Sequence, residues 1–144
     1  MNYQLFCEDY EFRFTIGKIK VMENNSKLRM YDSWFLKVGD APIETHNVSD
    51  SSFALQQIDG LLKDRTTAIS QGYVNGTQKY NIFYHSAWDN NRRIVTGRSQ
   101  DLSLGLCLVE DSSLHAIFLG LFAYPTLVSE ATRQALLILD SYSS

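Results

Sequence analysis

The stretch LSLGLCLVEDSSLHAIFLGLF, residues 102–122, decides the fold that the sequence predicts. From Leu102 to Leu108 every second residue is leucine and the residues between are small or polar, which is the period of a half-buried strand. A polar turn follows at residues 110–113, and residues 115–122 are apolar at nearly every position, which is typical of a strand inside a sheet. Two such strands joined by a short turn predict an antiparallel hairpin.

The same two-residue period extends the predicted sheet on the N-terminal side of this hairpin. Further strands are predicted at residues 79–87 and 92–97, and a closing helix is predicted from Thr126 or Ser129 onward. The buried face of this helix is predicted to consist of Val128, Ala131, Ala135, Ile138, Leu139 and Tyr142. The second half of the chain is therefore expected to hold four strands and a helix.

The first half of the chain repeats this plan. Its predicted strands are residues 3–8, 12–21, 28–38 and 42–48. From Phe53 the apolar positions follow helical spacing, with Asp50, Ser51 or Ser52 as candidate N-cap, and a loop is predicted at residues 66–76. The whole order predicts one α+β domain over residues 1–144, with two antiparallel four-stranded sheets and two helices.

Composition narrows the classes of function. The 144 residues are 44% apolar and 20% charged, with a formal net charge of -3, so we expect a folded domain without a broad basic field for polyanions. No segment approaches the roughly 18 consecutive apolar residues of a membrane span, and the first residues lack the pattern of a signal peptide. We therefore expect a cytoplasmic protein without a membrane partner, for which nucleic acid is a disfavoured ligand.

Motifs that carry chemistry are missing from the sequence. The histidines, His46, His85 and His115, are too far apart for a local metal site, and no nucleophile or phosphate-binding motif occurs. We expect no catalytic residue, no metal and no cofactor, although a hydrolase or nuclease centred on His85 or His115 is a lower-ranked alternative. Cys7 and Cys107 lie in apolar segments and are expected to be buried thiols, with a disulfide or a reactive thiol as the alternative.

Two groups of residues are candidates for binding a protein. The first group contains acidic residues at predicted turns, which form either solvated loops or a docking surface for a basic protein: Glu8, Asp9, Glu11, Asp32, Asp40, Glu110 and Asp111. The second is Trp88 with Asp89, which precede two arginines in a predicted loop, since tryptophan and arginine dominate binding hot spots. Trp88 is either an interface anchor or a ring folded back on the sheet.

The segments LFCEDYEFRFTI (5–16) and WFLKVGDAPI (34–43) contain a strand, an acidic turn, a second strand and a later aromatic strand that ends in glycine. In this order they resemble the bacterial immunity proteins of contact-dependent growth inhibition and related polymorphic toxin systems, over about residues 1–65. The resemblance implies an immunity protein, not an enzyme, that binds a cognate toxin C-terminal domain in a 1:1 complex. The toxin would be a nuclease, an RNase in preference to a DNase, blocked at its active site or in its access to substrate. The residues expected to contact it are Glu8, Asp9, Glu11, Trp88, Asp89, Glu110 and Asp111.

The overall layout is similar to the Whirly fold of single-stranded DNA-binding proteins, in which two antiparallel sheets cross and helices lie along them. Lys18-Ile19-Lys20 is the segment that resembles the basic motif of that family. The alternative hypothesis is therefore a Whirly-like single-stranded nucleic-acid-binding protein, which would use aromatic side chains as stacking platforms.

Overall fold

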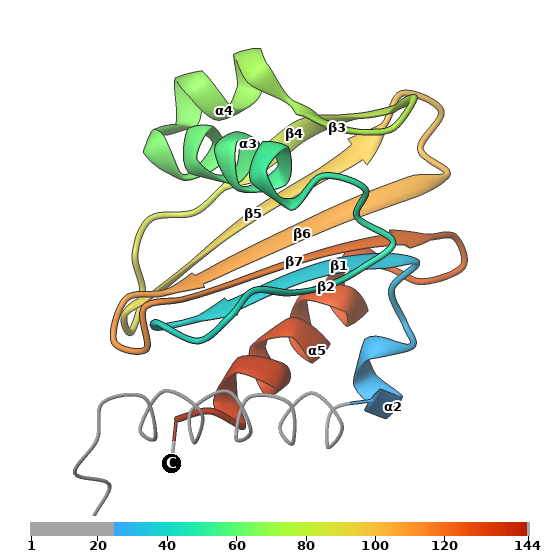
Figure 1. Ribbon diagram of the computed structural model, residues 1–144. Helices are drawn as coiled ribbons and strands as arrows, with labels where there is room; N and C mark the ends of the chain where they lie inside the picture. Colours follow the sequence, from blue (N-terminus) through green and yellow to red (C-terminus); the bar gives the residue numbers. More distant parts are fainter. Residues whose placement is uncertain (1–24, 144) are drawn as a thin grey trace, which may run out of the picture.

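A computed structural model describes residues 25–143, and its strands form one antiparallel sheet (Figure 1). The strands are β1 (Ser33–Val38), β2 (Glu44–His46), β3 (Tyr73–Asn75), β4 (Gln78–His85), β5 (Arg92–Ser99), β6 (Leu104–Asp111) and β7 (Ala116–Ala123). The helices of the described residues are α2 (Asn25–Leu28), α3 (Ser51–Lys63), α4 (Arg65–Gln71) and α5 (Val128–Asp140). Across the sheet the strands follow the order β2-β1-β7-β6-β5-β4-β3.

The predicted pair of four-stranded sheets with two helices is wrong. β1 pairs with β7, from Ser33 opposite Leu121 to Val38 opposite Ala116, and this pairing joins both halves of the chain. The result is a single seven-stranded sheet that carries four helices in the part of the chain described. The physical reason for the error is that alternation within a strand identifies its buried face but not its neighbour.

The loop predicted at residues 66–76 is also wrong, because the segment contains α4 and β3. Asp64 starts the extra helix, since its carboxylate accepts a hydrogen bond from the Thr67 amide at 2.7 Å. Gly72 ends this helix with a φ of 65°, a left-handed value that glycine adopts without strain, and β3 follows directly. Local capping therefore replaces the expected loop by a short helix and an edge strand.

Several predicted elements are confirmed. α3 begins after Asp50, whose carboxylate accepts a hydrogen bond from the Phe53 amide at 3.0 Å. The four strands and the helix predicted in the second half are present as β4 to β7 and α5. The strand predicted at residues 28–38 is confirmed only in its second part, β1. The strands predicted at residues 3–8 and 12–21 lie outside the described residues.

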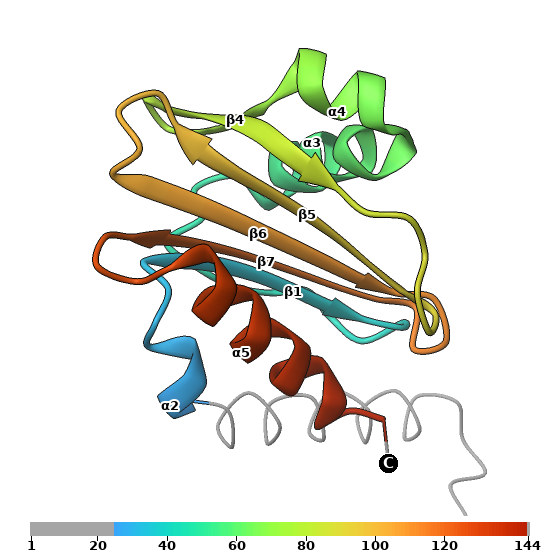
Figure 2. The ribbon, with the colours of Figure 1, turned by 180° about the vertical axis from the view of Figure 1, so that it is seen from behind.

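The helices cover the two faces of the sheet unequally (Figures 1 and 2). α3 and α4 pack on one face near β3 and β4, whereas α5 packs on β6 and β7 of the other face. The core on the α3 side contains Phe35, Ile58, Leu61, Leu106, Leu108 and Leu119. The core on the α5 side contains Tyr31, Cys107, Phe118, Ala131, Ala135, Ile138 and Leu139. Because α5 crosses β6 and β7, the same face of β4 and β5 has no described helix over it (Figure 2).

Tyr31 fixes the packing of α5 on the sheet. Its hydroxyl donates a hydrogen bond of 2.5 Å to the carbonyl of Ala131. Gly120 lies under the Tyr31 ring, where a Cβ atom would collide with that ring. Cys107 in the same core is a free, fully buried thiol, as expected, and burial raises its pKa to about 12. Cys7 lies outside the described residues.

Gln57 closes the edge of the sheet at β3. Its side-chain amide accepts a hydrogen bond from the Val74 N–H at 2.8 Å and donates one to the Val74 carbonyl at 3.0 Å. The Gln71 side chain in turn donates to the carbonyl of Gln57 at 2.8 Å. A side chain of α3 therefore takes the place that a neighbouring strand would occupy on this edge.

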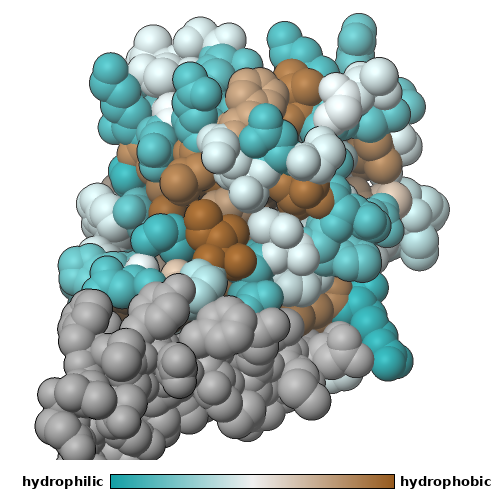
Figure 3. All heavy atoms as spheres, viewed as in Figure 1, coloured by the Kyte–Doolittle hydropathy of each residue, from teal (hydrophilic) through white to brown (hydrophobic). Residues whose placement is uncertain are grey.

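The surface on the α3 side is mixed in character. Apolar side chains reach it in small patches between polar ones (Figure 3). Phe53 on α3 and Ile69 on α4 are exposed apolar residues of these helices. None of the helices described has the length and apolar character needed to cross a membrane.

Candidate functional site

The structure divides the predicted binding residues between the two faces of the sheet. Three of them lie outside the described residues: Glu8, Asp9 and Glu11. In the β5–β6 pair, Arg92 lies opposite Asp111, and Arg93 lies opposite Glu110. Successive side chains of a strand point to opposite faces. Asp111 therefore lies with Arg92 on the α5 side, whereas Glu110 lies with Arg93 on the α3 side.

On the α5 side, Arg92 joins β5, β6 and α5. Its Nε donates to Oδ2 of Asp111 at 2.7 Å, and its Nη2 lies 2.8 Å from Oδ1 of Asp140. Burial would raise the pKa of Asp111, but hydrogen bonds from Arg92 and Ser113 outweigh it and hold this pKa below the ordinary value. Asp111 is buried, and its contacts are made within the protein.

On the α3 side, Trp88, Arg93 and Glu110 form one unit. The guanidinium carbon of Arg93 lies 4.7 Å from the centroid of the Trp88 ring. The Nε atom of Arg93 donates a hydrogen bond to Oε1 of Glu110 at 2.7 Å. The Trp88 side chain is 48% exposed, so it is neither free in solvent nor part of the core. The cation of this unit is balanced by its own carboxylate.

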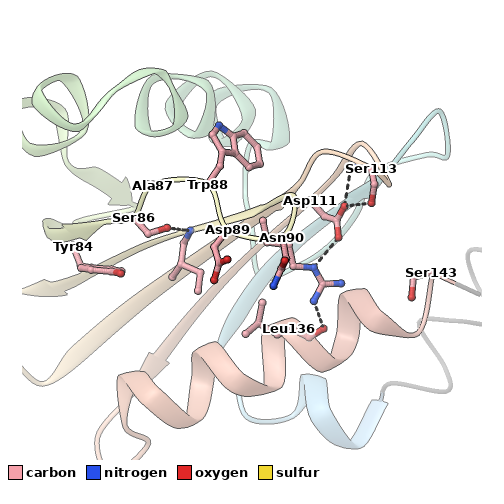
Figure 4. Close-up of a pocket in the computed structure, with 12 residues that line it drawn as sticks. Tyr84, Ser86, Ala87, Trp88, Asp89, Asn90, Asp111, Ser113, Leu136 and Ser143 are labelled. Atoms are coloured by element: carbon pink, nitrogen blue, oxygen red, sulfur yellow. Dashed lines mark hydrogen bonds and ion pairs between the residues drawn. The ribbon is translucent and has the colours of Figure 1, made fainter.

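The turn between β4 and β5 holds Asp89 in a fixed place. The Asp89 amide donates to the Arg92 carbonyl at 2.8 Å, and the Arg92 amide donates back at 3.0 Å. Asn90 and Asn91 between them have φ values of 52° and 67°, which is the geometry of a tight hairpin turn. In Figure 4 the Asp89 side chain extends from this turn toward the side where α5 lies.

A groove runs beside α5, over the uncovered faces of β4 and β5. Its volume is about 540 Å³. Val128, Thr132 and Leu136 line it from α5, and they share one face because they are four residues apart. The sheet contributes Tyr84 and Ile94, and the Tyr84 side chain is 54% exposed.

At the C-terminal end of α5 the groove opens into a larger cleft, drawn in Figure 4. The cleft has a volume of about 700 Å³ and lies between the β4–β5 turn and α5. Tyr84, Ile94 and Leu136 line both the cleft and the groove. The two hollows therefore form one continuous surface along α5.

Comparison with known proteins adds solved structures of the same architecture. No family model and no curated protein matches the sequence. Profilin II of Acanthamoeba castellanii is 19% identical, with a TM-score of 0.62 over 85% of this chain and 92% of that chain. The chain has a profilin-like fold. A profilin of Schizosaccharomyces pombe is also similar in structure, at 18% identity and a TM-score of 0.60 over 81% of this chain and 90% of that chain.

The profilin-like fold corrects the functional prediction. The predicted immunity function with its toxin partner, and the Whirly-like alternative, are wrong, since these solved structures of the same fold are profilins. A Whirly layout also needs two sheets, whereas the strands of residues 25–143 form one. The resemblance of residues 1–65 to immunity proteins stays a prediction, and its first segment lies outside the described residues.

The profilin-like chain places the two histidines of the hydrolase alternative in different surroundings. Nε2 of His85 lies 3.0 Å from the carbonyl of Leu61, at the end of α3. His115 is exposed in the β6–β7 turn, with a φ of 51°. Within residues 25–143, no group of three or more His, Cys, Asp or Glu side chains could hold a metal ion.

The groove of the profilin-like chain is made by residues that the sequence pattern did not single out. The sequence pattern predicts a strand around Tyr84 and a buried position for Val128, and it indicates a binding role for neither. A signal was nevertheless present, because Thr132 and Leu136 continue a stripe from Val128 beside the buried face. The stripe lines a groove only because no described helix covers the strands beside it.

Proposed function

We propose that this chain is a protein-binding module without catalytic activity, which docks a partner on the sheet face beside α5. The observation that carries the proposal is the open groove between α5 and strands β4 and β5, on a fold shared with profilins. The side chains that line this groove are mainly apolar, and an exposed apolar surface is a candidate interaction site. We also propose that the protein acts in the cytoplasm.

The chemistry of the groove supports docking of a protein surface. Tyr84 offers a half-exposed aromatic ring, and Val128 and Leu136 are only partly buried, so a partner would remove apolar area from water. Arg133 lies exposed at the rim, and no described acidic residue pairs with it. A rim charge of this kind steers association and selects the partner.

Monomeric actin is the first partner to test, because the solved structures of this fold are profilins. Calorimetric titration of the full chain with actin should show a saturable complex. Arg133→Glu reverses the rim charge. Thr96 on β5 also lines the groove, so Thr96→Lys places a long side chain in it. Each variant should weaken binding by about tenfold or more. Circular dichroism checks that both variants are folded.

Arg65→Glu is the matched control, since it makes the same charge reversal at an exposed position of α4, across the sheet from the groove. Its affinity should equal that of the unmodified chain. Absence of a complex with actin, or equal weakening by Arg65→Glu and Arg133→Glu, contradicts docking of actin on this face.

A further inference from the structure

The groove beside α5 is continuous with the cleft under the β4–β5 turn, so a partner docked in the groove would lie next to this cleft. Leu136 on α5 and Asp89 on the turn face this cleft from opposite sides (Figure 4). Its volume of about 700 Å³ is large enough for one or more side chains of a docked segment. A partner seated along α5 therefore reaches the cleft at the C-terminal end of this helix.

Charge distinguishes the cleft from the rest of the groove. Arg92, the cation that lines it, is already bonded to both Asp111 and Asp140. Asp89 is exposed and has no ion pair with any residue in the part of the chain that the structure describes. Two carboxylates, Asp89 and Asp111, and one guanidinium line the cleft. Because Asp111 and Asp140 already neutralise this guanidinium, the carboxylate of Asp89 leaves the cleft with an excess of negative charge.

The opposite face of the same strand end shows how this protein holds a cation. There the guanidinium of Arg93 lies over the Trp88 ring and pairs with the carboxylate of Glu110. The cleft contains the same two chemical groups, an exposed aromatic ring in Tyr84 and a carboxylate in Asp89. On this side no described cation pairs with that carboxylate, so a partner can supply one.

The other walls of the cleft suit the stem of a long cationic side chain. Ile94 and Leu136 are apolar, and lysine and arginine lay their methylene groups on such surfaces while their charged heads pair with carboxylates. We propose that the cleft binds a lysine or arginine side chain of a partner protein whose apolar segment docks along α5. That the side chain belongs to a protein rests on the proposed function, whereas the preference of the cleft for a cation does not.

The test uses the isotopically labelled full chain and small probes. Nα-acetyl-arginine methylamide and Nα-acetyl-lysine methylamide are titrated to about 20 mM, the range in which single side chains bind weakly. We expect saturable amide shifts in residues 84–92 and 136–140, which weaken as salt is added. Nα-acetyl-glutamine methylamide, which has no charge, should leave these amides unshifted.

Asp89→Asn tests the carboxylate, because no described hydrogen bond or ion pair uses this side chain. The variant should weaken binding of both cationic probes by about threefold or more. Asp59→Asn, the same change at an exposed position of α3, should leave it unchanged. Equal shifts from the uncharged probe, or full binding by Asp89→Asn, overturns the proposal. Actin is absent from this test, so failure of the cation site and failure of actin docking are separate results.

Discussion

The Nε atom of Arg92 donates a 2.7 Å hydrogen bond to Oδ2 of Asp111, across the β5–β6 pair, where the Asp111 side chain is 5% exposed. The same guanidinium reaches Asp140 near the end of α5 at 2.8 Å. One arginine therefore connects two strands and a helix. Because Arg92 lines the cleft under the β4–β5 turn, this connection joins a wall of the cleft to α5.

Replacing Asp111 by asparagine should destabilise the fold. The variant leaves the largely buried guanidinium of Arg92 with one carboxylate in place of two, and we expect a loss of about 2–4 kcal/mol in the free energy of unfolding. Urea unfolding followed by circular dichroism measures this loss. Asp140→Asn is the control: its side chain is 54% exposed, so its loss should be about 1 kcal/mol or less. Equal losses in the two variants contradict the burial argument.

Stability should fall in acid, in part through Asp101. The Ser103 hydroxyl and amide and the Ser99 hydroxyl donate to its carboxylate and lower the pKa of Asp101 to about 2. A carboxyl with a lowered folded pKa stabilises the protein above its unfolded pKa of about 3.9, and this stabilisation is lost as pH falls toward the folded value. Urea unfolding between pH 5 and pH 2 should therefore show a smaller decrease for Asp101→Asn than for the unmodified chain. The same decrease in both would contradict the assignment.

Gln57→Ala should open the edge of the sheet at β3. The variant leaves the N–H and carbonyl of Val74 without the Gln57 amide, and we expect a loss of about 1–3 kcal/mol in the free energy of unfolding. Hydrogen exchange at the Val74 amide should become faster. Gln56→Ala removes the exposed neighbouring glutamine and should change stability by less than about 0.5 kcal/mol.

Thr132→Val should stabilise the protein. The Thr132 hydroxyl oxygen is buried and has no hydrogen-bond partner in the structure described, so a methyl group of similar shape removes a desolvation penalty. We expect a gain of about 1 kcal/mol in urea unfolding. Thr66→Val on α4, where the threonine is exposed, should stay within about 0.5 kcal/mol of the unmodified chain. A loss in Thr132→Val would mean that the hydroxyl is hydrogen-bonded in solution.

Secondary structure in the second half of the chain could be predicted because the residue types there follow strand and helix periods. From Leu104 to Leu108 leucine alternates with small residues, although both faces of β6 are buried, and α5 shows the helical period. The strand that pairs with β1 could not be predicted. This strand is β7, whose Leu121 lies opposite Ser33, and a pairing between residues so far apart in the sequence depends on the whole fold. β3 has three residues, too few to show a period, and its edge is satisfied by a side chain.

The candidate site was less predictable than the strands. Trp88 and Asp89 are neighbours in the sequence, yet the Trp88 ring stacks with Arg93 on the α3 side, whereas the Asp89 side chain extends toward the side where α5 lies. Asp111 belongs to an acidic segment that predicts exposure to solvent. It is buried instead, because Arg92 lies directly opposite it in the β5–β6 pair. The exposure of Tyr84 follows from the position of α5 over β6 and β7, which no local pattern contains.

Gly120 and Tyr31 occupy one shared volume, because a Cβ atom at residue 120 would enter the space of the ring. Residue 120 cannot gain a side chain while the ring stays in place. An alanine at 120 requires a smaller side chain at 31, and that change also removes the hydrogen bond to Ala131. In natural relatives of this chain the two positions should therefore covary, or both remain as they are.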